Sequence, residues 1–320
     1  MLENNCYDSR MVGGYLVLLL TLLGVGAATG AVVVAGMALA LLMPPRMTDG
    51  KAVWLLRRLS PGDLGLGFED VAFSVRDDKT GQPMRIAGWW IPHPAAGGRC
   101  VVLLHGYADA KVGAIAWAPS WHALGFNVLA IDLRAHGESE GVHCTAGFWE
   151  RHDVDQTIDR LRAQRPAGTR KIVLFGLNVG AAVAVATAAM RDDVAALVLV
   201  DPPADFPRAA MTQMDRAGAP GRIFQHAALA IAEWIARCDF SAVRPAALVR
   251  RVRCPILMID VSCPPRDGVS IHPAMDQAIR ARRRDDDDVY FANGTGSGTE
   301  VGDRMACQAR MENFLKALRE

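Results

Sequence analysis

An uninterrupted run of uncharged residues near the amino terminus constrains this chain more than any other feature. The run extends from Met11 to Met43, which is 33 positions, and two prolines close it. A single membrane span needs roughly 20 apolar residues, so the run can cross a bilayer once with tilt or overhang. Two spans would need about twice that length and a polar turn, which the run lacks. We therefore predict one transmembrane helix over residues 11–43, behind a short tail over residues 1–10.

A cleaved signal peptide is the alternative interpretation of this run. Its apolar core would span about 7–15 residues behind a basic leader. Here the preceding residues include Glu3 and Asp8 as well as Arg10, and the apolar run is much longer, so we favour an uncleaved anchor. Gly26 and Gly30 form a four-residue step that could pack against another helix. We favour the interpretation that both are ordinary small residues of a span rich in Gly and Ala.

The basic residues on the two sides of the run predict its orientation. Arg10 is the one basic residue before the run, whereas Arg46, Lys51, Arg57 and Arg58 follow it. Since the more basic flank of a span stays in the cytoplasm, we predict a single-pass membrane protein with a cytoplasmic globular part. The seven cysteines are scattered and form no CxxC pair, which is typical of free thiols in a reducing compartment.

The overall charge excludes one class of partner. The chain has 35 Lys and Arg against 34 Asp and Glu, which gives a formal net charge of +1. Binding to nucleic acid through counterion release needs an excess of basic residues, so we expect no nucleic-acid partner. The lipid bilayer is the partner that the apolar run predicts, and a membrane protein is a second expected partner. The chain has no dinucleotide or P-loop fingerprint and no histidine spacing typical of zinc, so we expect no cofactor and no metal.

Beyond the run, short apolar segments alternate with helix-like ones. We interpret residues 44–66 as a linker, because the segment is rich in proline and basic residues. The predicted strands are Val71–Val75, Arg85–Ile91, Val101–Leu104, Val128–Ile131, Ile172–Phe175, Ala195–Val200, Pro255–Ile259 and Val289–Ala292. The predicted helices cover residues 114–124, 150–164, 179–190, 272–284 and 304–318. Strands separated by helices predict βαβ units and a mostly parallel sheet, and continuously apolar strands indicate a sheet that is covered on both faces.

This order predicts an α/β domain over residues 67–320. The first two strands are expected to form an antiparallel pair around the turn at residues 77–81. Residues 206–249 interrupt the alternation with Ala-rich helical sequence. We predict that this insertion forms a small helical cap over the carboxyl edge of the sheet.

Three motifs carry a resemblance to a known family. The second predicted strand contains the sequence Ala-Gly-Trp-Trp-Ile-Pro over residues 87–92, and the third leads into His105 and Gly106. The fourth leads into Asp-Leu-Arg-Ala-His-Gly-Glu-Ser over residues 132–139. With these motifs the chain resembles the α/β-hydrolase superfamily, and in particular its membrane-anchored serine aminopeptidase and esterase-like group. The resemblance covers about residue 68 to the C-terminus and implies the α/β-hydrolase fold.

In that fold the nucleophile lies in a G-x-S-x-G motif on a sharp turn between a strand and a helix. The matching segment here extends from Gly176 to Gly180, and its central residue is Asn178. A carboxamide has no hydroxyl or thiol that a base could activate, so we predict that this position supplies no nucleophile. Ser139 lies in a second G-x-S-x-G match, but no strand directly precedes it and no helix directly follows. We therefore interpret Ser139 as a loop residue.

The resemblance also locates the other two members of a catalytic triad. It places the histidine in the loop after the last strand, where this chain has Ser297, and the last histidine of the chain is His272. It places the acid after the strand at 255–259, where Asp267 is the candidate, with Asp201 as a second candidate. We interpret His272 as a surface or capping residue. Without a histidine to orient, the two aspartates are interpreted as loop or capping residues.

The oxyanion hole that the resemblance implies does not depend on these side chains. Its donors would be the backbone N–H groups of Tyr107 and Val179, which the turn geometry positions. We therefore predict a degenerate triad, loss of serine-hydrolase activity, and a protein that acts by binding or scaffolding, with a small carbonyl or carboxylate compound as ligand. Two alternatives stay open. The first is an active esterase-like or peptidase-like hydrolase with unorthodox catalytic residues. The second is that the turn from Gly176 to Gly180 is retained only because the strand and the helix pack closely there.

Overall fold

An eight-stranded sheet organises the computed structural model, which describes residues 4–55, 59–261, 272–292 and 301–316. The sheet has the order β1-β2-β4-β3-β5-β6-β7-β8, and the contacts of β2 with β1 and β4 are antiparallel whereas the others are parallel. The strands are β1 Glu69–Arg76, β2 Pro83–Ile91, β3 Arg99–Leu104, β4 Asn127–Ile131, β5 Lys171–Leu177, β6 Val194–Val200, β7 Ile256–Asp260 and β8 Asp288–Phe291. The predicted α/β class and the antiparallel opening pair are confirmed.

Helices cover both faces of this sheet. One face carries α5 Glu150–Gln164, α6 Val179–Ala188, α9 Pro245–Leu248 and α10 Pro273–Arg280. The other carries α2 Asp49–Trp54, α3 Lys111–Ala114, α4 Ala118–Ala123 and α11 Val301–Leu315. Successive strand residues point to opposite faces, so Val102 and Leu104 pack in the first layer while Val101 and Leu103 pack in the second. This two-sided burial explains why the strands are apolar at every position.

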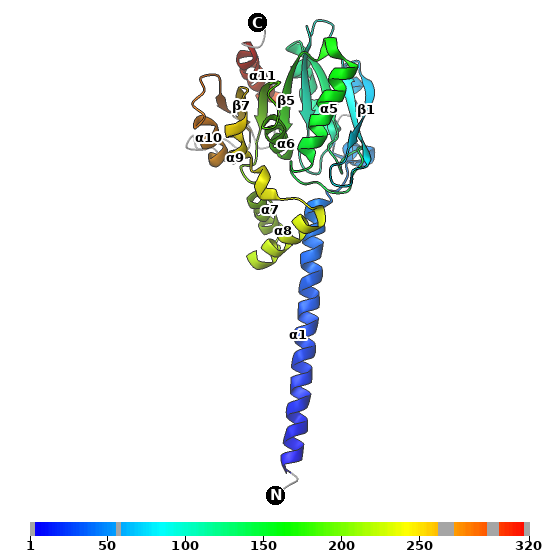
Figure 1. Cartoon of the computed structure of the whole chain (residues 1–320), viewed down its shortest axis with the longest axis vertical. Coiled ribbons are helices and arrows are strands. Elements are labelled where there is room, and N and C mark those ends of the chain that lie inside the picture. The colour runs from blue at the N-terminus through cyan, green and yellow to red at the C-terminus, as the bar shows by residue number, and fades with distance from the viewer. Residues whose placement is uncertain (1–3, 56–58, 262–271, 293–300, 317–320) are drawn as a thin grey trace.

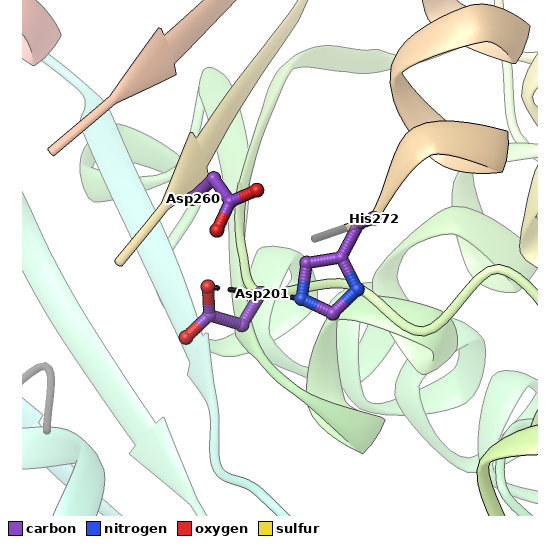
Figure 2. Close-up of side chains that lie close together, drawn as sticks. All are labelled: Asp201, Asp260 and His272. Atoms are coloured by element: carbon purple, nitrogen blue, oxygen red, sulfur yellow. Dashed lines mark ion pairs between the residues drawn. The ribbon is translucent and has the colours of Figure 1, made fainter. Parts of the chain in front are cut away.

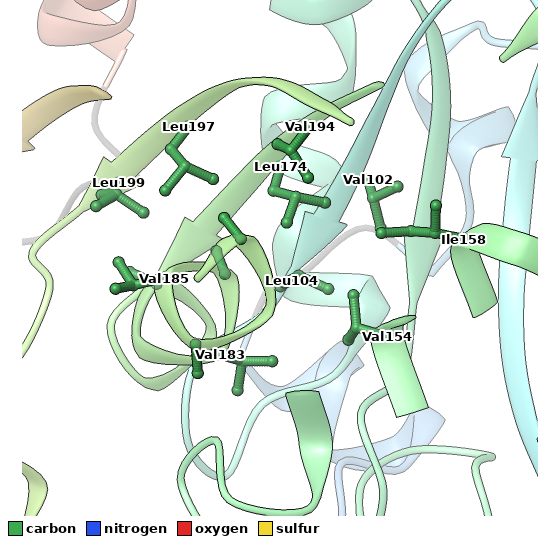
Figure 3. Close-up of a cluster of buried hydrophobic side chains, with 14 of the residues drawn as sticks. Val102, Leu104, Val154, Ile158, Leu174, Val183, Val185, Val194, Leu197 and Leu199 are labelled. Atoms are coloured by element: carbon green, nitrogen blue, oxygen red, sulfur yellow. The ribbon is translucent and has the colours of Figure 1, made fainter. Parts of the chain in front are cut away.

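The first layer illustrates how the central strands are held (Figure 3). Val154 and Ile158 of α5 and Val183 of α6 lie against Leu104 and Leu174 of neighbouring strands, and all five side chains are buried. Burying one such aliphatic side chain contributes about 1.5–3 kcal/mol. The layer therefore fixes α6, and with it the turn that precedes α6, against the sheet.

The predicted transmembrane run forms a single long helix. Helix α1 extends from Asn4 to Leu42 and projects away from the sheet domain (Figure 1). Its segment Gly14–Leu42 is long and apolar enough to cross a membrane. The side chains from residue 14 to residue 29 are exposed, whereas Val34, Ala38 and Leu42 are buried against the rest of the protein.

The segment predicted to be a linker, residues 44–66, contains more structure than a linker needs. It carries α2, which begins after the N-cap Thr48, and a 3-10 helix over Pro61–Leu64. Met47 and Ala52 are buried in the second layer. The Arg46 guanidinium donates hydrogen bonds to the carbonyl oxygens of residues 137, 139 and 141 at 2.8–3.0 Å. The segment is therefore bound to the domain, because its apolar side chains and Arg46 find partners that no local pattern reveals.

The predicted cap is helical. Between β6 and β7 the chain forms α7 Phe206–Arg216, α8 Arg222–Ala236 and α9, with short 3-10 helices at Phe240–Val243 and Val249–Arg251. The Asp205 side chain accepts a hydrogen bond from the Arg208 N–H and so caps the start of α7. Helices α7 and α8 lie next to the sheet and beside the end of α1 that joins the domain (Figure 1). The boundaries of the predicted domains themselves stay a prediction.

Candidate functional site

The turn between β5 and α6 has the geometry of a nucleophile elbow. Asn178 separates the strand from the helix, with φ 50° and ψ −114°, and its side chain is exposed. Its N–H donates to the Val200 carbonyl at 2.9 Å, and its own carbonyl accepts from the Ala181 N–H at 2.9 Å. A positive φ is strained for a residue with a Cβ, although Asn tolerates it better than most. The turn therefore presents the Asn178 carboxamide at its tip, as expected from the sequence.

The two glycines of the motif allow strand and helix to approach closely. A methyl group added at Gly180 would overlap the carbonyl oxygens of Leu104 and His105. One added at Gly176 would overlap the backbone of Gly180 and Ala181. These overlaps are with backbone atoms, which cannot rotate away. Packing alone thus requires Gly176 and Gly180, whether or not the turn has any chemistry.

The loop after β3 lies beside the elbow, as the resemblance implied. The position of a Cβ at Gly106 would be 3.6 Å from Asn178 Cβ. Val179 is the first residue of α6, so its N–H has no acceptor within the helix. Among the described residues, the N–H of Tyr107 has no hydrogen-bond acceptor either. Both groups are available as donors, and their role as an oxyanion hole stays a prediction.

His105 is a structural residue in this loop. Its ring is fully buried, Nε2 accepts a hydrogen bond from the Leu133 N–H at 3.0 Å, and Nδ1 donates to the Gly106 carbonyl at 2.7 Å. Burial lowers the pKa of His105, which favours the neutral ring that both bonds require. With both nitrogens engaged, His105 ties β3 to β4 and has no nitrogen left for a ligand.

The motif at residues 132–139 is likewise held by internal bonds. Asp132 accepts from the Lys111 N–H at 2.7 Å and from Lys111 Nζ at 2.8 Å. The Ser139 hydroxyl donates to the Asp132 carbonyl at 2.7 Å and accepts from the Ala87 N–H at 2.9 Å, and Ser139 is 1% exposed. Because the Ser139 hydroxyl is buried and already donates and accepts a hydrogen bond, it is poorly placed to attack a substrate. This agrees with the interpretation of Ser139 as a loop residue.

Three chemically active side chains meet at the carboxyl edge of the sheet (Figure 2). Asp201 directly follows β6, Asp260 ends β7, and His272 precedes α10. His272 Nε2 lies 3.9 Å from Asp201 Oδ1, and one ligand atom of each of the three residues lies within 4.8 Å of the others. Asp201 Oδ1 also accepts from the Val261 N–H at 2.8 Å. This set could act as an imidazole–carboxylate pair, and carboxylate and imidazole are also ligands of divalent metals.

The interpretation of His272 as a surface or capping residue did not anticipate this cluster. It occupies the N-cap position of α10, but its side chain makes no capping hydrogen bond and is 20% exposed. Asp201 and Asp260 are polar residues at the ends of two adjacent parallel strands, and this pattern is the sequence signal from which the cluster could have been predicted. The other predicted triad positions, Asp267 and Ser297, lie outside the described residues.

The end of α1 and the cap border the elbow. The Tyr107 hydroxyl donates to the Ala40 carbonyl at 2.6 Å, and the Cys144 N–H donates to the Leu42 carbonyl at 2.7 Å. The last carbonyls of a helix lack partners within it, so these two groups cap α1. Burial raises the pKa of the Tyr107 hydroxyl, which keeps it protonated as a donor. Val179 packs in one apolar cluster with Leu42 and with side chains of α7 and α8.

Comparisons with known proteins agree with this geometry. Residues 97–239 match the family described as "Serine aminopeptidase, S33". Over 125 residues the chain is 34% identical to the uncharacterized protein Rv2307c of Mycobacterium tuberculosis (strain ATCC 25618 / H37Rv), a match that covers 39% of this chain and 43% of that protein. It is 28% identical over 140 residues to the uncharacterized protein YfhR of Escherichia coli O157:H7, covering 41% of this chain and 46% of that protein. The chain therefore spans less than half the length of these relatives.

Solved structures share the fold at low identity. The esterase Pf2001 of Pyrococcus furiosus superposes with a TM-score of 0.68 at 20% identity, over 87% of this chain and 98% of that chain. The α/β-hydrolase GrgF from Penicillium sp. sh18 gives a TM-score of 0.56 at 19% identity, over 79% and 99%. At such identities the likeness concerns the fold alone. The strand order, the elbow and these comparisons identify the chain as an α/β-hydrolase-fold protein that resembles the serine aminopeptidase family.

Proposed function

We propose that this chain is a membrane-anchored α/β-hydrolase-fold protein that binds a small carbonyl or carboxylate compound at the elbow without hydrolysing it. One observation carries the proposal: the exposed tip of the elbow presents Asn178 beside the N–H groups of Tyr107 and Val179, for which the described residues supply no acceptor. A carboxamide cannot be deprotonated to a nucleophile, whereas backbone donors bind oxygen whatever side chain the tip carries.

Membrane anchoring through α1 is part of this proposal. The segment Gly14–Leu42 supports it by length and composition. The basic residues that follow the segment favour a cytoplasmic globular part, and the capped end of α1 supports an anchor that is integral to the fold. A signal sequence would be removed, and its removal would leave Tyr107 and the α7–α8 cap without their partners on α1.

The binding proposal is tested with butyrate as the probe and the full chain in phosphatidylcholine nanodiscs. We expect butyrate to raise the midpoint of thermal unfolding, since a ligand that binds only the folded state stabilises it. The isosteric change Asn178→Asp places a negative charge beside the donors and is expected to weaken butyrate binding at least about tenfold. Asn313→Asp, on the exposed surface of α11, is the matched control and is expected to bind as the native chain does.

Two results would contradict the proposal. The first is equal butyrate binding by the native chain and by Asn178→Asp. The second is covalent labelling of the native chain by a fluorophosphonate probe that a single serine substitution, such as Ser139→Ala, abolishes.

The cluster at the carboxyl edge favours one second candidate, a hydrolase with unorthodox catalytic residues. His272, paired with Asp201, would take a proton from water, the resulting hydroxide would attack the substrate carbonyl, and the proton would pass to the leaving alkoxide. This candidate predicts turnover of p-nitrophenyl butyrate that His272→Gln and Asp201→Asn each reduce by about 10²-fold or more, with exposed His226→Gln as the control. Absence of turnover by the native chain excludes it.

A further inference from the structure

Helix α8 exposes an apolar face. Ile223 is 84% exposed and Trp234 is 80% exposed, and exposed Ala230 lies between them in sequence. Ile223 and Ala230 are seven positions apart, and Ala230 and Trp234 are four positions apart. This spacing places the three residues on one side of an α-helix. The opposite side is also apolar and is buried through Ala228, Leu229, Ala232 and Ala236. A tryptophan and an isoleucine this exposed on one helix face are costly in water.

This helix is packed against the candidate membrane span. Gly30, Val34, Ala38 and Leu42 recur every fourth residue of α1 and form the side that faces the cap. A methyl group added at Gly30 would lie 3.4 Å from the Phe224 ring. Position 30 therefore lies at the contact between α1 and α8, at ordinary van der Waals distance from Phe224. Gly26, the other glycine of the four-residue step, has nothing within 4 Å of its Cβ position.

The length of α1 sets the depth of α8. A hydrocarbon core about 30 Å thick corresponds to about 20 helical residues at 1.5 Å per residue. Counted from Met11, the first residue after Arg10, these 20 residues end at Gly30. This is the level at which Phe224 meets α1, so the start of α8 lies at the boundary between acyl chains and headgroups. A span that begins later along α1 would immerse α8 more deeply.

The charges at the ends of α8 fit the same position. Arg222 begins the helix and Arg237 follows it, and both are exposed. Arginine at the ends of an apolar helix can extend to phosphate groups while the apolar side chains stay in the lipid. Tryptophan such as Trp234 is enriched at this boundary, because its ring is apolar and its N–H is polar.

We propose that α8 is a membrane-surface helix whose exposed face, formed by Ile223, Ala230 and Trp234, inserts among the phospholipid acyl chains of the leaflet in which α1 ends. The inference rests on the proposed anchoring by α1 and adds a second, lateral contact with the bilayer. Its consequence is that the cap, and the carboxyl edge beneath it, lie against the membrane. A ligand of the elbow would then reach it from the lipid side, which favours an amphiphilic carbonyl or carboxylate compound.

The test measures quenching of tryptophan fluorescence in the full chain, reconstituted in nanodiscs with and without phosphatidylcholine brominated near the headgroup end of its acyl chains. Trp234 is one of seven tryptophans. We expect Trp234→Phe to remove most of the quenching that depends on brominated lipid. Trp54→Phe is the matched control, because Trp54 is also 80% exposed but lies on α2, and we expect it to keep that quenching.

The outcomes separate this inference from the anchoring on which it rests. Chain that does not co-purify with nanodiscs, or that has lost α1, overturns the anchoring. Chain that co-purifies but shows the same bromolipid quenching in the native form and in Trp234→Phe overturns the insertion of α8 alone. If each nanodisc contains two chains and brominated lipid does not quench Trp234, the exposed face of α8 contacts a second copy of the chain and not lipid. That result also overturns the insertion of α8.

Discussion

At the scale of single residues, the motifs most typical of the fold are used here for structure. His105 and Ser139 have every polar atom of their side chains engaged with backbone groups, and Asp132 holds Lys111. Gly176 and Gly180 are required by close backbone contacts. These residues are therefore engaged in packing and in internal hydrogen bonds, around a turn whose central residue, Asn178, cannot be a serine-type nucleophile.

The glycine requirement gives a prediction about stability. Gly180→Ala places a methyl group against the carbonyl oxygens of Leu104 and His105, so we expect a loss of about 3 kcal/mol in the free energy of unfolding. Gly50→Ala is the control, because Gly50 is also helical and has nothing within 4 Å of its Cβ position. There Ala should be neutral or stabilising by up to about 1 kcal/mol. Chemical denaturation followed by circular dichroism measures both, and equal midpoints for the two variants would refute the close-packing argument.

At the scale of elements, the most informative contact joins α1 to the cap. The same helix that is apolar enough to span a membrane has a buried side at Val34, Ala38 and Leu42, and its last carbonyls are capped by Tyr107 and Cys144. A membrane anchor needs none of these contacts. They indicate that α1 is also a structural element of the globular part, and that the cap depends on it.

The packing of α1 on the cap predicts different effects at neighbouring alanines of α1. Ala38 is fully buried against the cap, so Ala38→Leu must separate α1 from it, at a cost of about 1–3 kcal/mol. Ala40 is exposed, so Ala40→Leu should change stability by less than about 0.5 kcal/mol. Thermal unfolding of the chain in nanodiscs, followed by near-UV circular dichroism, is the measurement. A melting point that falls equally in both variants would mean that α1 does not pack on the cap.

At the scale of the whole molecule, a buried pair of imidazoles couples stability to pH. The His136 ring is fully buried, packs edge-to-face on His105 with 4.8 Å between ring centroids, and donates from Nδ1 to the Arg134 carbonyl at 2.8 Å. Burial, followed by the electrostatic coupling to the neighbouring His105, lowers the pKa of His136 from 6.5 to about 4. Between these values the unfolded chain binds a proton that the folded chain does not, so the folded state loses stability as pH falls through this window.

We therefore expect the melting temperature to fall between about pH 6.5 and about pH 4, with His136 contributing up to about 1.4 kcal/mol per pH unit. His136→Asn removes the titrating group and keeps an N–H donor near Nδ1, so its melting temperature should depend less steeply on pH. The exposed His226→Gln variant is the control and should follow the native slope. An unchanged slope in His136→Asn would show that His136 is not the coupled group.

Much of the fold could be predicted from the order of residues. Strand and helix positions follow from apolar periodicity and from turn residues, which are local properties, and the structure confirms the mostly parallel sheet. The segment predicted to be one helix over residues 114–124 instead contains the last residue of α3, a 3-10 turn at Ile115–Trp117 and then α4. Pro119 supplies no N–H and so fits only the first turn of a helix, where α4 begins.

The candidate site was predictable only in part, and the division has a physical cause. The sequence by itself determined the long apolar helix, the α/β class and the absence of a serine at the elbow, because each depends on residue type or on short spacing. Only the tertiary structure decided that His272 meets Asp201 and Asp260, that Arg46 and Tyr107 tie α1 and the segment after it to the domain, and that α8 lies against α1. These contacts join segments that are far apart along the chain. They depend on how the packed sheet and cap bring surfaces together, which no local pattern of residues encodes.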